Sequence, residues 1–318
     1  MPSFDSVNYA IRPNKNVERK LMAECLKALE MKFDIPSYHY IGLGSMWFVD
    51  FILFHKMLSI DKMYSIERPK YADRADFNKP LNCIEVLSGE TTKVLPDIDL
   101  SNRRHLIWLD YDRGLDGSAL EDIAIVCKKA KSGSILIVTI NASLTQLSRK
   151  NEQNEEITRA DALKELTGIL TLPYKEKDFT TKKFPPILGK ILFDKAKNST
   201  IKAGRNKRFY PIFNFFYIDS TPMITIGGMV SNETDKTLLD QCDLKKNFDY
   251  VTEEIQYKID IPPLTPKEKI ALDRLLPCQS LPSAGQIEAS TGFKLKQSQI
   301  DSYSCFYKHY PVYAEIAL

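Results

Sequence analysis

The stretch 38-YHYIGLGSMWFVDFILFHKMLSIDKMYSIE-67 decides the fold of this chain. It begins with a short strand pattern, residues 39–43, which runs into a glycine turn. Apolar residues then recur at helical spacing over residues 49–57, and residues 62–66 form a second strand pattern that ends at Glu67. A strand, a turn, a helix and a strand in this order predict the nucleoside-binding half of a Rossmann-like α/β sheet.

Two glycines and one acid in this unit predict where a ligand binds. Gly42 and Gly44 carry no Cβ, so the chain can turn tightly and a ligand can approach the main chain. The helix that follows begins with unpaired N–H groups and a partial positive charge. Glu67 lies 23 residues after Gly44, where a carboxylate can accept hydrogen bonds from both hydroxyls of a ribose. We therefore expect nucleoside binding here, with an ordinary strand-to-helix turn as the alternative.

The glycine pattern also narrows the kind of ligand. The full dinucleotide fingerprint GxGxxG is absent, because Trp47 stands where the third glycine would be. A loop that binds a pyrophosphate is therefore less favoured than one that binds a cofactor without a pyrophosphate.

Composition and charge describe an ordinary globular chain. Its 318 residues are 43% hydrophobic and 27% charged, with a net charge of +3, so the overall charge indicates no particular partner. No apolar run is long enough to span a membrane, and the N-terminus lacks a signal-peptide core. Six cysteines are scattered without a CxxC pair, and there are only four histidines. We expect reduced thiols in a cytoplasmic protein, and neither a zinc site nor a disulfide framework.

Further strand patterns extend the sheet. Residues 83–87, 105–109 and 134–140 are apolar runs separated by helical or polar segments, which is typical of a parallel sheet covered on both faces. Residues 210–217 and 223–230 are two more, joined by a short turn, and predict an antiparallel hairpin. The prediction is a mostly parallel seven-stranded sheet with a C-terminal antiparallel hairpin.

We predict three parts: an N-terminal helical extension (1–35), a Rossmann-like domain (36–260) and a small helical subdomain (261–318). In the extension, a helix over residues 17–31 with Asn16 as its N-cap either packs on the sheet edge or sets Arg12 or Lys15 over a ligand carboxylate. In the subdomain, three short helices favour a packed cap. A helix-turn-helix is the alternative, but the segment lacks a dense basic face.

Residues 175–208 form the most basic stretch of the chain, with eleven Lys or Arg against three acids. Arg205, Lys207 and Arg208, near Tyr210, are the candidates for binding an anionic substrate, because arginine binds phosphate in a bidentate fashion and stacks on bases. A solvated lysine-rich loop is the alternative interpretation. Nucleic acid is a further candidate partner for this stretch and the C-terminal helices.

The order of strands and helices over residues 36–232 resembles the S-adenosylmethionine-dependent methyltransferases of the Rossmann-like class. The motifs YIGLGSMWFVDF, MYSIE, FNKP, IWLDYD and YKHYP are similar to those of a group of O-methyltransferases known mainly from bacterial genomes, some of them in multi-gene antiviral defence loci. The resemblance implies S-adenosylmethionine as cofactor and protein partners from the same locus.

The resemblance also implies a role for each motif. The methionine part of the cofactor would lie on Gly42, Gly44 and Ser45, the ribose on Glu67 and the adenine amino group on Glu90. The end of the fourth strand, Asp110, Tyr111 and Asp112, would face the methyl acceptor. There, Asp110 or Asp112 is the candidate base for a hydroxyl acceptor. The two carboxylates could instead hold a divalent cation, although no further ligands support one.

Two departures from the superfamily pattern stand in the glycine loop. The acid that commonly precedes the loop is Tyr40 here, and Met46 stands where the methyltransferase loop pattern, as distinct from the dinucleotide fingerprint, has its third glycine. These departures favour a second hypothesis, a catalytically silent Rossmann-like protein that binds a nucleotide or serves as a scaffold. Neither the Asn/Asp-Pro-Pro-Tyr motif of amino-group methyltransferases nor a cysteine nucleophile follows the fourth strand. An oxygen atom is therefore the expected acceptor.

Overall fold

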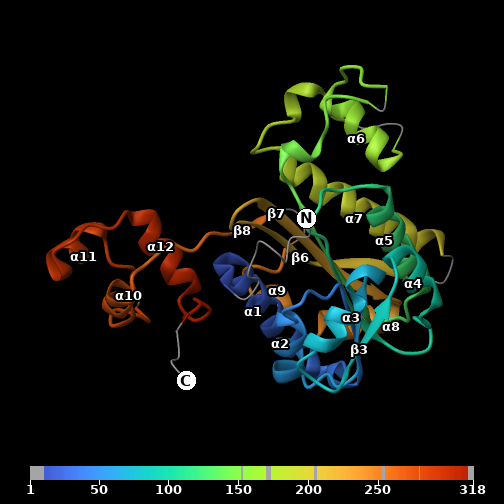
Figure 1. The fold of residues 1–318 in the computed structure, drawn as a ribbon. Coiled ribbons are helices and arrows are strands. Elements are labelled where there is room, and N and C mark those ends of the chain that lie inside the picture. Colours follow the sequence, from blue (N-terminus) through green and yellow to red (C-terminus); the bar gives the residue numbers. More distant parts are fainter. Residues whose placement is uncertain are drawn as a thin grey trace.

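The chain folds around one twisted sheet with helices on both faces (Figure 1). This computed structural model describes residues 11–151, 153–169, 173–203, 206–252, 255–278 and 280–313. The strands are β1 (His39–Gly42), β2 (Met63–Glu67), β3 (Ile84–Ser88), β4 (His105–Asp110), β5 (Ser134–Asn141), β6 (Arg208–Ile218), β7 (Pro222–Ser231) and β8 (Tyr257–Ile259).

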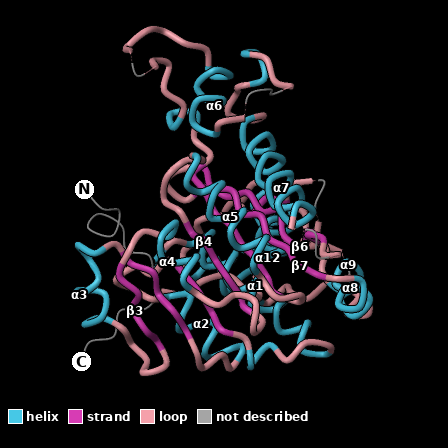
Figure 2. Tube along the Cα trace, turned by 90° about the vertical axis from the view of Figure 1, so that its right-hand side faces the viewer, coloured by secondary structure: helices cyan, strands magenta, loops and turns pink. Residues whose placement is uncertain are grey.

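The helices alternate with the strands as far as β6 and cluster after β7 (Figure 2). They are α1 (Pro13–Ala28), α2 (Val49–Leu58), α3 (Pro69–Asn78), α4 (Thr91–Asp97), α5 (Gly117–Lys129), α6 (Arg159–Thr167), α7 (Phe184–Lys202), α8 (Glu233–Asp240), α9 (Leu244–Asn247), α10 (Pro266–Asp273), α11 (Ala284–Thr291) and α12 (Gln297–Phe306). Short 3₁₀ turns are Leu29–Met31, Ile35–Ser37, Leu144–Gln146 and Glu176–Asp178.

The strand order is β3-β2-β1-β4-β5-β7-β6-β8. The first five strands are parallel, and β7 runs antiparallel between β5 and β6. This confirms the predicted mostly parallel sheet with an antiparallel hairpin. The difference is an eighth strand, β8, which pairs with β6 at the sheet edge. Three residues are too few to show a strand period, so the sequence did not reveal it.

Alternation along the strands divides the core into two layers. Ile135 and Ile137 on β5 pack in the layer that includes α1 and α2, whereas Leu136 and Val138 pack in the layer that includes α5 and α7. Successive strand residues point to opposite faces, so strands covered on both faces are apolar throughout. All eight residues of β5 are accordingly buried.

The N-terminal helix begins earlier than the sequence indicated. Its first residue is Pro13, and Arg12 rather than Asn16 occupies the N-cap position. The Arg12 side chain makes no cap hydrogen bond. Instead, Asp219 in the turn between β6 and β7 accepts hydrogen bonds from the backbone N–H groups of Asn14 (2.9 Å) and Lys15 (3.1 Å). A cap from a residue more than 200 positions away has no local sequence signal.

The three C-terminal helices pack on one another to one side of the sheet (Figure 1). Leu272, Ile287 and Ile300, one from each helix, share a separate small core. Capping boxes open α10 (Thr265 with Glu268) and α11 (Ser283 with Gln286). The proposed limits of the three parts of the chain stay predictions.

Asp219 should contribute measurably to stability because it caps α1. We expect Asp219→Ala to lower the free energy of unfolding by about 1–3 kcal/mol, since it leaves two helix N–H groups without an acceptor. Asp260→Ala is a matched control, because Asp260 forms an exposed ion pair with Lys258 and should change stability by less than about 1 kcal/mol. Urea denaturation of the two variants tests this, and equal effects would contradict the capping role.

Candidate active site

A cavity of about 550 Å³ opens at the carboxyl ends of β1 to β4. In open α/β sheets, ligands bind at this edge, where the strand order reverses. The reversal here lies between β1 and β4. The predicted residues that line the cavity are Gly44, Ser45, Glu67, Glu90, Asp110, Tyr111 and Asp112.

Gly42 and Gly44 serve different purposes. Gly42 ends β1, and a Cβ built on it would lie 2.7 Å from the Tyr40 hydroxyl and 3.0 Å from the Phe51 ring, so its role is packing. A Cβ on Gly44 would lie 2.6 Å from Glu67 Oε1. Gly44 therefore lets the loop approach the end of β2, and of the two glycines only it lines the cavity.

Glu67 is a buried carboxylate with unused acceptor capacity. The residue is 7% exposed, and its Oε1 has no hydrogen-bond partner within the described residues. Burial raises the pKa of Glu67 to about 8, with the charge of Asp50 adding to the rise and Arg68 opposing it. A buried acceptor without a donor is unfavourable. Donors from a bound ligand, such as two ribose hydroxyls, would satisfy it.

Helix α1 brings buried charges to the other end of the cavity. Lys15 is fully buried, and its ammonium lies 2.9–3.0 Å from both carboxylate oxygens of Asp110 and 3.0 Å from Glu18. Arg12, by contrast, lies 3.6 Å from Asp219. The hypothesis that Arg12 or Lys15 faces a ligand carboxylate is therefore wrong. The α1 residue that lines the cavity is Arg19, one helical turn after Lys15.

The ion pair fixes the position of Asp110. Lys15 lies against the Trp108 ring, 4.4 Å from its centroid, and the Trp108 indole donates to Thr139 on β5. The Asp110 side chain is 23% exposed, so it is held from behind by Lys15 while part of it remains accessible.

The other two residues at the end of β4 differ from Asp110. The Tyr111 hydroxyl donates to Asp122 on α5 (2.6 Å), and burial raises the pKa of Tyr111 well above its ordinary value. Its hydroxyl is thus engaged inside the fold, while Asp112 is exposed at the rim. The catalytic roles of Asp110, Tyr111 and Asp112 stay predictions, and this geometry favours the two aspartates over the tyrosine.

Glu90 lies at the end of the cavity beside β3. It occupies the N-cap position of α4, its side chain is 55% exposed, and its carboxylate lies 3.5 Å from Arg68. The contact between Glu90 and an adenine amino group stays a prediction, and this exposed carboxylate is not held as firmly as Glu67.

The basic residues predicted to bind substrate lie elsewhere. Arg208 begins β6 opposite Ser231 of β7, level with the amino end of β5, whereas the cavity is at the carboxyl ends of the parallel strands. Lys207 is 5% exposed, and its ammonium donates to the carbonyl of Ala130. Lys207 and Arg208 therefore lie away from the cavity, which contradicts the prediction that they bind its anionic substrate. Arg205 lies outside the described residues.

The reason is the path of the chain. The basic stretch includes helix α7, which returns the chain from the side of the carboxyl end of β5 to the amino end of β6. The described residues that precede α7, 142–151, 153–169 and 173–183, project beyond the sheet around α6 (Figures 1 and 2). They join the end of β4 through a hydrogen bond from the Gly114 N–H to Gln146 (3.0 Å).

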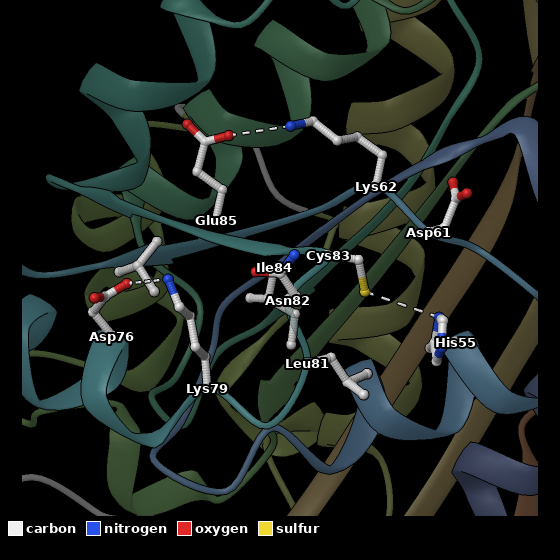
Figure 3. Close-up of a pocket in the computed structure, with 11 residues that line it drawn as sticks. His55, Asp61, Lys62, Asp76, Lys79, Leu81, Asn82, Cys83, Ile84 and Glu85 are labelled. Atoms are coloured by element: carbon white, nitrogen blue, oxygen red, sulfur yellow. Dashed lines mark hydrogen bonds and ion pairs between the residues drawn. The ribbon is translucent and has the colours of Figure 1, made fainter.

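A second depression, of about 770 Å³, lies at the opposite edge of the sheet (Figure 3). His55, Lys62, Cys83 and Glu85 are among its lining residues, and they surround the amino ends of β2 and β3. Lys62 pairs with Glu85 at 3.3 Å across this depression. Its position separates it from Gly44 and Glu67.

Two features are absent from the described part of the chain. No group of three or more His, Cys, Asp or Glu side chains there is arranged to hold a metal ion. Within the same residues, no helix combines the length and apolar character that a membrane span requires.

Residues 7–318 match the model of a family described as "Putative O-methyltransferase". The chain belongs to this family. The chain is therefore a methyltransferase, which agrees with the class of enzyme predicted from the sequence. No curated protein matches the sequence.

Several solved structures are similar to the chain at low identity. Trm1 from Pyrococcus horikoshii, solved with S-adenosyl-L-methionine, has a TM-score of 0.46 at 14% identity over 70% of this chain and 56% of its own. The O-methyltransferase TomG from Streptomyces achromogenes has a TM-score of 0.35 at 13% identity over 65% and 79%. An O-methyltransferase from Bacillus cereus has a TM-score of 0.34 at 14% identity over 68% and 90%. The chain's own strand order is the stronger evidence for its fold.

Glu67 should make stability fall as the pH rises. Its pKa in the folded protein, about 8, is above the unfolded value of 4.5, so its contribution is complete below pH 4.5 and is lost up to about pH 8. We expect ligand-free Glu67→Gln to be more stable than wild type by roughly 2–4 kcal/mol at pH 9, and similar to it at pH 4. Urea unfolding at both pH values measures the difference.

The control is Glu85→Gln on the neighbouring strand β3, where the side chain is 55% exposed. This variant should follow wild type at both pH values. If Glu67→Gln also ran parallel to wild type, the buried carboxylate would not be the source of the pH dependence.

Proposed function

We propose that this chain transfers the methyl group of S-adenosylmethionine to an oxygen atom. The observation that carries the proposal is the buried Glu67 carboxylate, whose Oε1 lacks a partner within the described residues and lies beside the Gly44 loop. A ribose offers two hydroxyl donors to such a group.

The remaining cavity residues suit the rest of this cofactor. Glu90 lies at the β3 end, where an adenine ring would extend from a ribose on Glu67. Gly44 and Ser45 lie at the β1 end, where the methionine part would follow. The methyl group would then face the end of β4, because that strand is next to β1.

The acceptor side contains the carboxylates needed for a hydroxyl substrate. Methyl transfer is an in-line displacement, in which positioning of donor and acceptor supplies much of the rate acceleration. An alcohol or phenol must also lose its proton, and Asp110 and Asp112 are the cavity carboxylates at this end. Lys15 already holds both oxygens of Asp110, so we assign these residues to proton transfer rather than to metal binding.

We also propose an anionic or nucleotide-like acceptor. Support comes from Arg113, which directly follows Asp112 and lines the cavity. Its guanidinium pairs with Asp116 and donates to Ser118 at 2.7 Å, so it is held at the start of α5 rather than loose in solvent. A fixed cation at the rim would favour substrates that carry a phosphate or carboxylate.

The alternative, a silent nucleotide-binding scaffold, was favoured by Tyr40 in place of an acid. The Tyr40 hydroxyl donates to Asp50, which also lines the cavity. A carboxylate is therefore present at this corner despite the substitution, which supports the catalytic hypothesis over the silent one.

The test separates binding from turnover. We expect Asp112→Asn, at the exposed rim, to bind S-adenosylhomocysteine within about threefold of wild type and to lower turnover by about 10²–10⁴-fold. Asp110→Asn should lower turnover as well, but it also removes the partner of buried Lys15, so its stability and binding should fall too. Calorimetry measures binding, and S-adenosylhomocysteine formation with a panel of phenols, carboxylic acids and nucleotides measures turnover.

Mass spectrometry of the product identifies the methylated atom. Methylation on nitrogen or sulfur would overturn the oxygen assignment, and loss of binding in parallel with turnover in Asp112→Asn would place Asp112 in the fold rather than in catalysis. Wild-type protein that binds S-adenosylhomocysteine but methylates none of the panel would favour the silent scaffold.

A further inference from the structure

We propose that Asp50 binds the α-ammonium group of the cofactor's methionine part, that Tyr40 positions Asp50, and that Arg19 binds the α-carboxylate. This inference rests on the proposed function, because it divides that cofactor between the two ends of the cavity. The acid that commonly stands just before the glycine loop, where β1 has Tyr40, would thus be replaced by Asp50 on helix α2.

Tyr40 contacts Asp50 from inside the fold. Tyr40 is fully buried on β1, so it cannot touch a ligand, and its ring packs edge-on against Phe51 (4.8 Å) and Phe54 (5.1 Å). Its hydroxyl donates to the carboxylate of Asp50, in the first turn of α2. Strand β1 thus supplies a tyrosine, and the tyrosine holds a carboxylate that lines the cavity.

The charges of Asp50 and Arg19 are complementary to those of an α-amino acid. An α-amino acid carries one cation and one anion on the same carbon. Asp50 and Arg19 both line the cavity, Arg19 is only 3% exposed, and Asp50 is half-buried. Burial raises the pKa of Asp50 and the positive charge of Arg19 opposes that rise, so the two groups are close enough for their charges to interact. A zwitterion matches such a pair of opposite charges.

The other basic side chains in and near the cavity lie away from the β1 end. Lys15 is enclosed between Asp110 and Glu18 and does not line the cavity. Arg68 lies 3.5 Å from Glu90, at the adenine end, and Lys70 lies 5.5 Å from the Tyr71 ring centroid at the start of α3, after β2. Arg113 pairs with Asp116 on α5. With the ribose on Glu67, the methionine part extends toward β1, where Arg19 is the cavity-lining cation supplied by α1.

A purely structural role is the competing explanation. Asp50 and Arg19 lie on α2 and α1, and these two helices pack together. If their charges only hold the helices together, substitutions should weaken every ligand of the cavity to a similar extent. If they bind the amino-acid part, only ligands that carry it should be affected.

The experiment compares two ligands by calorimetry. S-adenosylhomocysteine carries the amino-acid part, whereas 5′-methylthioadenosine has the same nucleoside and sulfur without it. For Asp50→Asn and Arg19→Met we expect the affinity for S-adenosylhomocysteine to fall about 10- to 100-fold, the range for a hydrogen bond to a charged group, and that for 5′-methylthioadenosine to change less than about threefold. Tyr40→Phe should show the same selectivity with a smaller loss.

Glu67→Gln is the matched control, because it should weaken both ligands by the same factor. Retained 5′-methylthioadenosine binding shows that a variant is folded. Unchanged S-adenosylhomocysteine affinity in Asp50→Asn, or equal losses for both ligands, would overturn the assignment while leaving the proposed function intact. Wild-type protein that bound neither ligand would instead remove the proposed function itself.

Discussion

The ion pair between Lys15 and Asp110 is the interaction on which the arrangement of the site depends. It joins the N-terminal helix to the end of β4, and the ammonium also lies 3.0 Å from Glu18. Removing one partner of a buried pair leaves an uncompensated charge, which is strongly unfavourable. The backbone at Lys15 is held as well, since its N–H donates to Asp219 of the β6–β7 turn. Helix α1 therefore enters at one position, which places Arg19 in the cavity wall.

The same burial that fixes the site leaves it energetically unsatisfied without a ligand. Burial raises the pKa values of Glu67 and Asp50, so the folded chain disfavours their charged forms. Neither group is an error of packing, because each lies where a ligand can supply donors. Groups of this kind lower stability in the free protein and contribute affinity in the complex. Perturbed carboxylates in a cleft are typical of functional sites for this reason.

Chain path explains the largest difference between sequence and structure. The basic residues before β6 follow β5 in sequence, and β5 ends beside the cavity. Helix α7 intervenes, and parallel strands require their connection to return the chain to the opposite edge of the sheet. Lys207 and Arg208 consequently lie at the amino ends, where Lys207 donates to the α5 terminus at Ala130. The basic residues follow β5 in sequence, but they do not lie near the cavity at its carboxyl end.

The amino-acid sequence alone was enough to predict the sheet, the glycine turn and the position of Glu67, because apolar periodicity, residues without a Cβ and a carboxylate at the end of a strand are local signals. It also placed Asp110 and Asp112 at the end of β4, next to that turn. The folded structure alone shows which charged residues of α1 are buried, since the helical pattern in the sequence does not distinguish the buried Lys15 from an exposed lysine. It likewise shows that Asp219 caps α1 and that Tyr40 holds Asp50. Each of these contacts joins separate elements, and their energies depend on burial, which exists only once the chain has folded.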